Sequence, residues 1–165
     1  MAFITLSSEP VTTIGELPAV GEQAPAFELV GSEMNNVTLD DFAGKRVVLN
    51  IFPSLDTGIC ATSVRKFNEL AAGLEDTVVL SVSKDLPYAH NRFCTDEGIE
   101  NVVSTSAFRS SFGDDYGVTM TDGKQKGLLA RSIVVLDKSG KVIYNQQVPE
   151  IKTEPDYDAA IAALN

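Results

Sequence analysis

The sequence has little cysteine. Cys60 and Cys94 are the only two cysteines among its 165 residues. Two cysteines are too few for a secreted disulfide scaffold, and a chain of this length buries enough apolar surface to fold without one. In a cytosolic protein such a pair is more often catalytic or redox-active than structural. We therefore expect a cytoplasmic protein whose cysteines carry chemistry.

Long apolar runs and an excess of positive charge are also missing. No segment approaches the roughly 20 apolar residues that a membrane-spanning helix needs, and MAFITLSSEP at the start lacks the basic and apolar parts of a signal peptide. The formal net charge is −10, which disfavours contact with nucleic acid or anionic membranes. The sequence therefore predicts neither a nucleic acid nor a membrane as partner.

Internal repeats, low-complexity tracts and linkers are absent as well, so we expect residues 1–165 to form a single domain. The turn-like cluster SSEP separates FITL from VTTIG and predicts an N-terminal hairpin. Buried strands are predicted at VVLNIF (47–52) and TVVLSVS (77–83), which are apolar with little alternation. KSG between LLARSIVVLD and KVIYNQQV is a hairpin signal. Shorter extended pieces are AFELV, NNVTL and NVVSTS.

Helical patterns alternate with these strands. After the loop at Pro53, apolar residues recur at steps of four and three and share one helix face: Cys60, Val64, Phe67, Ala71 and Leu74. A second helix begins near Pro87 and stops at Gly98, so Cys94 falls late in it. EPDYDAAIAAL closes the chain as a helix with one apolar side. This alternation, followed by a hairpin, predicts an α/β fold with a mixed sheet.

Cys60 stands in the first turn of its predicted helix. There the unpaired backbone N–H groups and the helix dipole favour the nucleophilic thiolate, whereas burial on the apolar face opposes it. A reactive thiolate at Cys60 therefore needs additional polar groups that stabilise its charge. Thr57 can offer a hydroxyl to the sulfur or to its target, and Pro53 stiffens a loop that shields the site. From the residues alone, Cys60 also fits a small buried apolar residue and Thr57 a helix N-cap.

Pro53, Thr57 and Cys60 form the pattern P-x-x-x-T-x-x-C, which resembles the active-site motif of peroxiredoxins. Four longer segments extend the similarity over essentially the whole chain: PVTTIGELPAVGEQAPAFELV, VTLDDFAGKRVVLNIFPSLDTGICATSVRKFN, SVSKDLPYAHNRFC and TEPDYDAAIAAL. They resemble the bacterial thiol peroxidases, atypical two-cysteine peroxiredoxins. The resemblance implies a thioredoxin-like α/β fold, with a mixed central sheet flanked by helices and an added N-terminal β-hairpin.

The resemblance also implies a role for each candidate residue. Cys60 would be the peroxidatic cysteine, whose thiolate attacks the peroxide O–O bond and becomes a sulfenic acid. Cys94 would be the resolving cysteine, which then forms an intramolecular disulfide with Cys60. Thr57 would hydrogen-bond the peroxide and the sulfur, and Pro53 would keep water out. Arg131, in LLARSIVV, would stabilise the thiolate and polarise the departing oxygen.

For the protein as a whole, the resemblance implies an antioxidant peroxidase. Its substrates would be hydrogen peroxide and alkyl hydroperoxides, with a preference for organic hydroperoxides, and its reductant would be thioredoxin. The family uses no metal, flavin or haem, so no cofactor is expected. A homodimer is implied too.

Other activities fit the residues less well. A thioredoxin-type oxidoreductase uses C-x-x-C at a helix start, but CATS puts Ser63 at the second position. A cysteine hydrolase would need His90, the only histidine, as its base, and we expect that residue at the surface. One histidine and two distant cysteines make no zinc-binding spacing. A thiol-based sensor stays open, as do a surface role for Arg131 and a core-filling role for Cys94.

Overall fold

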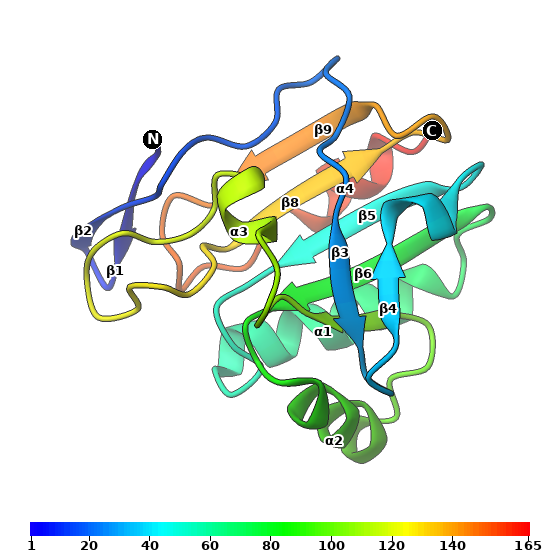
Figure 1. Ribbon diagram of the computed structural model, residues 1–165, viewed down its shortest axis with the longest axis horizontal. Coiled ribbons are helices and arrows are strands. Elements are labelled where there is room, and N and C mark those ends of the chain that lie inside the picture. The colour runs from blue at the N-terminus through cyan, green and yellow to red at the C-terminus, as the bar shows by residue number, and fades with distance from the viewer.

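The computed structural model describes residues 1–165 (Figure 1). The elements are, in chain order, β1 (Phe3–Leu6), β2 (Glu9–Thr12), β3 (Glu28–Gly31), β4 (Asn36–Thr38), the 3-10 helix η1 (Leu39–Phe42), β5 (Arg46–Ile51), α1 (Gly58–Ala71), β6 (Thr77–Ser83), α2 (Pro87–Glu97), β7 (Val103–Ser106), α3 (Phe112–Asp115), β8 (Ser132–Leu136), β9 (Val142–Gln147) and α4 (Tyr157–Ala162). The predicted α/β alternation is confirmed. No helix reaches the length and apolarity that crossing a membrane requires.

The main sheet is mixed, as predicted, with the strand order β4-β3-β7-β6-β5-β8-β9. Strands β5, β6 and β7 are parallel, whereas β8 runs antiparallel to β5. The register pairs Ile51, the last residue of β5, with Val82 of β6 and with Ser132, the first residue of β8. The loop that leaves β5 at Pro53 therefore lies beside the segment that enters β8, where Arg131 stands.

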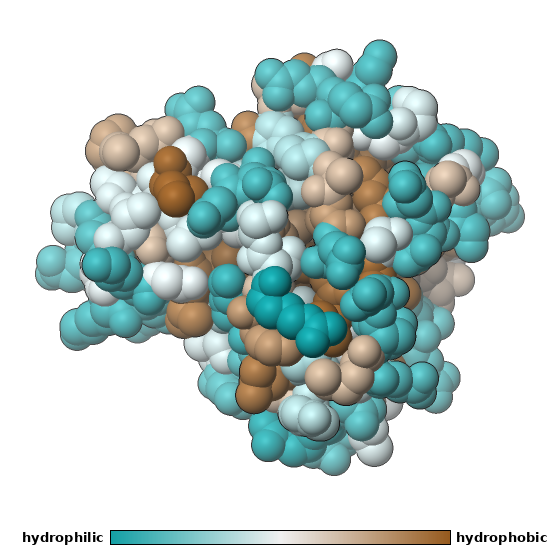
Figure 2. Space-filling view, viewed as in Figure 1, coloured by the Kyte–Doolittle hydropathy of each residue, from teal (hydrophilic) through white to brown (hydrophobic).

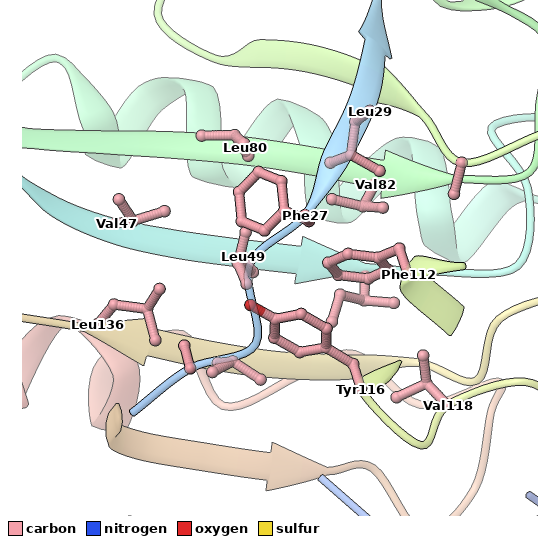
Figure 3. Close-up of a cluster of buried hydrophobic side chains, with 14 of the residues drawn as sticks. Phe27, Leu29, Val47, Leu49, Leu80, Val82, Phe112, Tyr116, Val118 and Leu136 are labelled. Atoms are coloured by element: carbon pink, nitrogen blue, oxygen red, sulfur yellow. The ribbon is translucent and has the colours of Figure 1, made fainter. Parts of the chain in front are cut away.

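One face of the sheet carries an aromatic layer. Phe27, Phe112 and Tyr116 pack there against strand residues such as Leu49 (Figure 3). The rings of Phe112 and Tyr116 are stacked with their centroids 4.3 Å apart, and the Tyr116 hydroxyl donates to the Pro25 carbonyl at 2.8 Å. This layer holds neither cysteine nor histidine. Both cysteines pack in the layer on the opposite face of the sheet.

The opposite face is covered by α1 and α4 (Figure 1). Cys60, Val64 and Phe67 of α1 are fully buried in this layer, as their spacing predicts. Leu74 also packs here, but from beyond the helix, because α1 ends at Ala71. Full burial of a side chain such as Phe67 stabilises the fold by roughly 1.5–3 kcal/mol. The layer thus anchors the helix that carries Cys60.

Strands β1 and β2 form the predicted N-terminal hairpin as a separate two-stranded sheet. Its second strand begins at Glu9, inside the cluster expected to be the turn, and ends at Thr12, before most of VTTIG. Only Ser7 and Ser8 turn the chain, both with positive φ. A two-residue turn of this kind matches the twist of the flanking strands, which explains why the observed turn is shorter than predicted.

Glu150 fastens this hairpin to the rest of the molecule. Its carboxylate accepts hydrogen bonds from the backbone N–H groups of Lys152 (2.9 Å) and Ser8 (2.8 Å) and from the Thr5 hydroxyl (3.1 Å). These donors, with the Lys152 N–H foremost, lower the pKa of Glu150 to about 2. Apolar residues of the hairpin pack against Ile151. The hairpin thereby supports the segment next to Arg131.

The face of the molecule seen in Figure 2 is largely hydrophilic, and its hydrophobic residues show as small, separate areas. A net charge of −10 accompanies this surface. A net charge this far from zero disfavours nonspecific aggregation.

Candidate active site

Cys60 lies in the first turn of α1 and is completely buried. Thr57 is the N-cap of that helix, and its hydroxyl oxygen accepts the Cys60 N–H at 3.3 Å. The same hydroxyl donates to the Ser54 carbonyl at 3.1 Å. Of the two roles that the sequence left open for Thr57, the capping role is therefore present in this reduced form, with the hydroxyl proton directed away from the sulfur.

Arg131 is buried beside Cys60, with 1% of its surface exposed. Its Nη2 donates to the Cys60 Sγ at 3.2 Å, and its Nε donates to the Ile151 carbonyl at 2.8 Å. The guanidinium is permanently charged, so it stabilises negative charge on the sulfur. Its Nη1 is buried without a hydrogen-bond partner, so its N–H groups can donate to a polar atom that enters the site. The alternative of a surface arginine is wrong, because the β5–β8 register carries Arg131 inside.

A cavity of about 160 Å³ opens next to these groups. Its lining includes Pro53, Thr57 and Arg131 from the candidate set, with Ile59 and Ile151 as apolar neighbours. A larger hollow of about 710 Å³ lies beside β3, but no cysteine or histidine lines it. The small cavity is thus bordered by Pro53, Thr57 and Arg131, whereas Cys60 itself is fully buried and does not line it.

Cys94 lies in the last turns of α2 and is half-buried. Both cysteines are free thiols. The Sγ of Cys94 is 3.0 Å from the Ser104 hydroxyl. Burial raises the pKa of the Cys94 thiol, and the Ser104 hydrogen bond opposes that shift more weakly. Cys94 packs against the same apolar layer as Cys60, so the structure brings both cysteines to one face of the sheet but does not join them.

His90 is fully buried, so the expectation of a surface histidine is wrong. It lies on the inner side of α2, which packs against β7. Burial lowers the pKa of His90 to about 4, although the nearby Asp85 carboxylate opposes the shift. Its Nε2 is hydrogen-bonded to the Ser83 hydroxyl at 2.9 Å. The imidazole is therefore neutral and bonded to a serine rather than to either cysteine.

Sequence reasoning missed Asp85. Its carboxylate accepts from the Leu55 N–H at 2.8 Å and from the hydroxyls of Ser54 at 2.8 Å and Ser83 at 2.6 Å. A signal was present: polar residues stand at the carboxyl end of an apolar strand, just before a helix that begins with proline, which is where ligand and support groups gather in α/β sheets. No group of three or more His, Cys, Asp or Glu side chains is arranged to hold a metal ion.

Comparison with known proteins agrees with this geometry. The family model named Redoxin matches residues 19–161. The chain is 59% identical to a thiol peroxidase of Corynebacterium glutamicum, with all of both chains covered. It is also 59% identical to a thiol peroxidase of Mycobacterium tuberculosis, with 99% of each chain covered.

Solved structures agree as well. A peroxiredoxin-like protein from Aquifex aeolicus superposes with a TM-score of 0.93 at 40% identity, covering 98% of this chain and 95% of that one. A thiol peroxidase from Chromobacterium violaceum reaches a TM-score of 0.91 at 21% identity, over 98% and 94% of the two chains, which shows the shared fold. The thioredoxin-like fold is thus confirmed, and the chain belongs to the redoxin family and, within it, to the thiol peroxidase group of peroxiredoxins.

Proposed function

We propose that this protein is a thiol peroxidase that reduces hydrogen peroxide and alkyl hydroperoxides, with Cys60 as its nucleophile. One observation carries the proposal: the buried Arg131 guanidinium donates to the Cys60 sulfur at 3.2 Å, beside a cavity at the start of a helix. A fixed cation and a helix N-terminus both favour the thiolate, the form of cysteine that attacks peroxides.

The first chemical step uses this arrangement directly. The Cys60 thiolate attacks one peroxide oxygen, so that an S–O bond forms and the O–O bond breaks. The displaced oxygen leaves with the electron pair as hydroxide or alkoxide and takes up a proton to become water or alcohol. The free Nη1 of Arg131 is placed to stabilise that developing negative charge. Cys60 is left as a sulfenic acid.

Cys94 completes the cycle as the resolving cysteine. Its sulfur attacks the sulfenic sulfur, water leaves, and an intramolecular disulfide forms. A disulfide needs Cα atoms within about 7 Å of each other, yet each cysteine is held within its own helix. Local unwinding at Cys60, at Cys94 or at both therefore precedes this step. A dithiol reductant of the thioredoxin class then restores both thiols.

The molecular setting is part of the proposal. Residues 1–165 act as one domain, since Glu150, in the segment that follows β9, binds Thr5 and Ser8 of the hairpin. A homodimer is supported by exposed apolar side chains on neighbouring segments, Leu86 and Tyr88 before and within α2 and Phe108 after β7. A Tyr88→Ser variant tests this surface: we expect its mass in solution to fall from that of a dimer to that of a monomer. We propose the cytoplasm as its compartment, where thioredoxin keeps such cysteines reduced.

The test measures hydroperoxide consumption with thioredoxin, thioredoxin reductase and NADPH. Wild-type protein should turn over repeatedly, whereas Cys60→Ser should be inactive. Cys94→Ser should react with one equivalent of peroxide, stop as the sulfenic acid and over-oxidise at high peroxide. Intact mass of the oxidised wild type should show a single chain that has lost two hydrogens. Substantial turnover by Cys60→Ser would refute the assignment, and a single slow reaction of the wild type would favour a thiol-based sensor.

A further inference from the structure

Asp85 stands where polar groups from two parallel strands meet. Its Oδ1 accepts from the Ser54 hydroxyl, and its Oδ2 accepts from the Leu55 N–H and the Ser83 hydroxyl, all within 2.8 Å. Ser54 and Leu55 belong to the loop after β5, while Ser83 ends β6. Hydrogen bonds to a carboxylate are roughly twice as strong as neutral ones. This half-buried group therefore holds the loop after β5 against the start of α2.

A continuous series of hydrogen bonds runs from Asp85 to the nucleophile. Beyond Ser54, the Ser54 carbonyl accepts from the hydroxyl and the N–H of Thr57, at 3.1 and 3.2 Å. The Thr57 hydroxyl in turn accepts from the Cys60 N–H. Pro53 and Thr57 also line the cavity. The shape of the cavity and the first turn of α1 thus both depend on a loop that Asp85 fixes.

A second series runs from Asp85 into α2. The Ser83 hydroxyl has one proton, which it donates to the Asp85 carboxylate, so the Nε2–H of His90 is the donor in their 2.9 Å bond. The buried imidazole is neutral, and its Nδ1 has no partner. His90 lies one helical turn before Cys94 on the same helix. The same carboxylate is thereby tied to the helix of the second cysteine.

Two other polar links join α1 and its preceding loop to α2. Arg65 of α1 donates two hydrogen bonds to the Glu97 carboxylate at the end of α2, at 2.9 and 3.0 Å, but this pair lies at the surface and away from the loop before Cys60. The exposed pair Arg92 and Asp56 joins α2 to the loop at 3.9 Å, with both side chains more than half exposed. Surface ion pairs at such a distance contribute about 0–1 kcal/mol. Asp85 is therefore the most buried of these polar links and the one that binds the loop directly before Cys60.

We propose that Asp85 is a positioning residue that sets the balance between peroxide attack at Cys60 and disulfide formation with Cys94. With its hydrogen bonds intact, the loop and the first turn of α1 hold the attacking geometry. When they are weakened, both segments open more often, which slows attack and speeds disulfide formation. The inference rests on the proposed peroxidase cycle, but its structural part is testable without that activity.

The variants are Asp85→Asn, which keeps the size but loses the charge, and Ser54→Ala, which removes one of the two loop-side contacts and leaves the Leu55 N–H bond in place. Stoichiometric hydroperoxide is mixed rapidly with reduced protein, the reaction is quenched with acid, and intact mass follows the sulfenic acid and the disulfide separately. We expect Asp85→Asn to slow attack by about fivefold and to speed disulfide formation by about fivefold, in line with the loss of one charge-assisted bond. More peroxide should then be needed to over-oxidise Cys60.

Ser54→Ala should shift both rates in the same directions by a smaller factor. The effects of the two changes should be less than additive in the double variant, because both act on the contact between Ser54 and residue 85. Asp137→Asn is the matched control. Its carboxylate accepts from Ser139 and Lys141 in the β8–β9 turn in the same manner but lies away from both cysteines. A general loss of stability would appear in this control as well, without opposite shifts of the two rates.

Amide hydrogen exchange of the reduced protein provides the test that does not use activity. Peptides covering residues 54–62 and 87–97 should both exchange faster in Asp85→Asn, and neither should change in Asp137→Asn. If the wild type lacks peroxidase activity but this pattern holds, the proposed function fails and the coupling stands. If the wild type is active while Asp85→Asn leaves exchange unchanged in either segment, or moves both rates in one direction, the role of Asp85 is refuted.

Discussion

Arg131 has a demanding position for a charged side chain. Burial of a guanidinium is expensive unless it is hydrogen-bonded and faces negative charge. Here Nε is satisfied by a backbone carbonyl, Nη2 faces the Cys60 sulfur, and Nη1 has no partner. A neutral thiol would leave this cation poorly compensated, whereas a thiolate neutralises it. The buried guanidinium is therefore placed to compensate negative charge at the Cys60 sulfur.

Arg131→Met should slow peroxide attack by about a hundredfold, since removal of a donor that stabilises a developing anion has effects of that order. Arg131→Lys should recover only part of the rate, because one ammonium group does not reproduce the two guanidinium contacts. Rapid-mixing measurement of Cys60 oxidation checks both variants. Lys138→Met, which removes a partly exposed surface cation, is the control. An unchanged attack rate in Arg131→Met would remove Arg131 from the mechanism.

The pKa of the Cys94 thiol, raised by burial, predicts how the second step depends on pH. Only the thiolate attacks, so disulfide formation should accelerate as pH rises through and above the ordinary thiol range of about 8.5. Ser104→Ala removes the hydrogen bond that holds this pKa down. The variant should therefore form the disulfide more slowly at neutral pH and need a higher pH to reach the same rate.

Acid-quenched samples taken between pH 6 and 9.5 report this disulfide step in both proteins. Oxidation of Cys60 serves as the internal control, because Ser104 is bonded to Cys94 and not to the nucleophile. A Ser104→Ala profile that coincides with the wild-type profile would contradict the proposed effect of the hydroxyl.

At the scale of the elements, both cysteines lie in terminal turns. Cys60 is in the first turn of α1, and the Cys94 carbonyl accepts from the N–H of the C-cap Gly98, which adopts the left-handed conformation at φ 66°. Helix ends open at much lower free energy than a whole fold. The central strands lack that freedom, since β5 is paired on both sides. Disulfide formation therefore needs only the ends of two helices to move.

Oxidation should leave the sheet unchanged and open these helix ends. Hydrogen exchange of the oxidised protein is expected to rise in residues 58–62 and 91–98, with β5, β6 and β8 as protected as in the reduced form. Cys94→Ser treated with one equivalent of peroxide is the control, since it forms no disulfide and should keep the reduced pattern. Faster exchange across β5 or β6 on oxidation would contradict this picture and imply rearrangement of the core.

At the scale of the whole molecule, His90 links stability to pH. Its pKa is about 4 in the fold and about 6.5 when unfolded, so the unfolded chain binds the extra proton. The stability that this group contributes is complete above pH 6.5 and is lost as pH falls towards 4. The full shift corresponds to about 3 kcal/mol. Glu150 and the other carboxylates with lowered pKa values act below about pH 4.5, so the two effects occupy separate ranges.

Denaturant unfolding at pH 7, 6, 5 and 4.5 measures this dependence. The wild type should lose stability progressively from pH 6.5 downward, and His90→Gln, although less stable at pH 7, should have a flatter profile over that range. A wild-type stability that is constant between pH 6.5 and 4.5 would contradict a buried neutral His90.

The sequence by itself determined the local structure and the motif. Apolar steps of four and three placed Cys60 on the buried face of a helix, Pro87 and Gly98 marked the ends of α2, and the apolar runs marked β5 and β6. These features depend on residues close together in the chain, where periodicity and capping act. The contiguous pattern from Pro53 to Cys60 is local in the same sense, so its residues were found together.

Only the tertiary structure decided which distant side chains meet that motif. Arg131 reaches Cys60 across 71 residues of sequence, because the antiparallel register of β5 and β8 sets Ile51 opposite Ser132. Asp85 and the burial of His90 likewise follow from the parallel pairing of β5 with β6 and from the packing of α2. Composition and periodicity carry no information on the register between strands far apart in the chain, since it is set by the packing of whole layers.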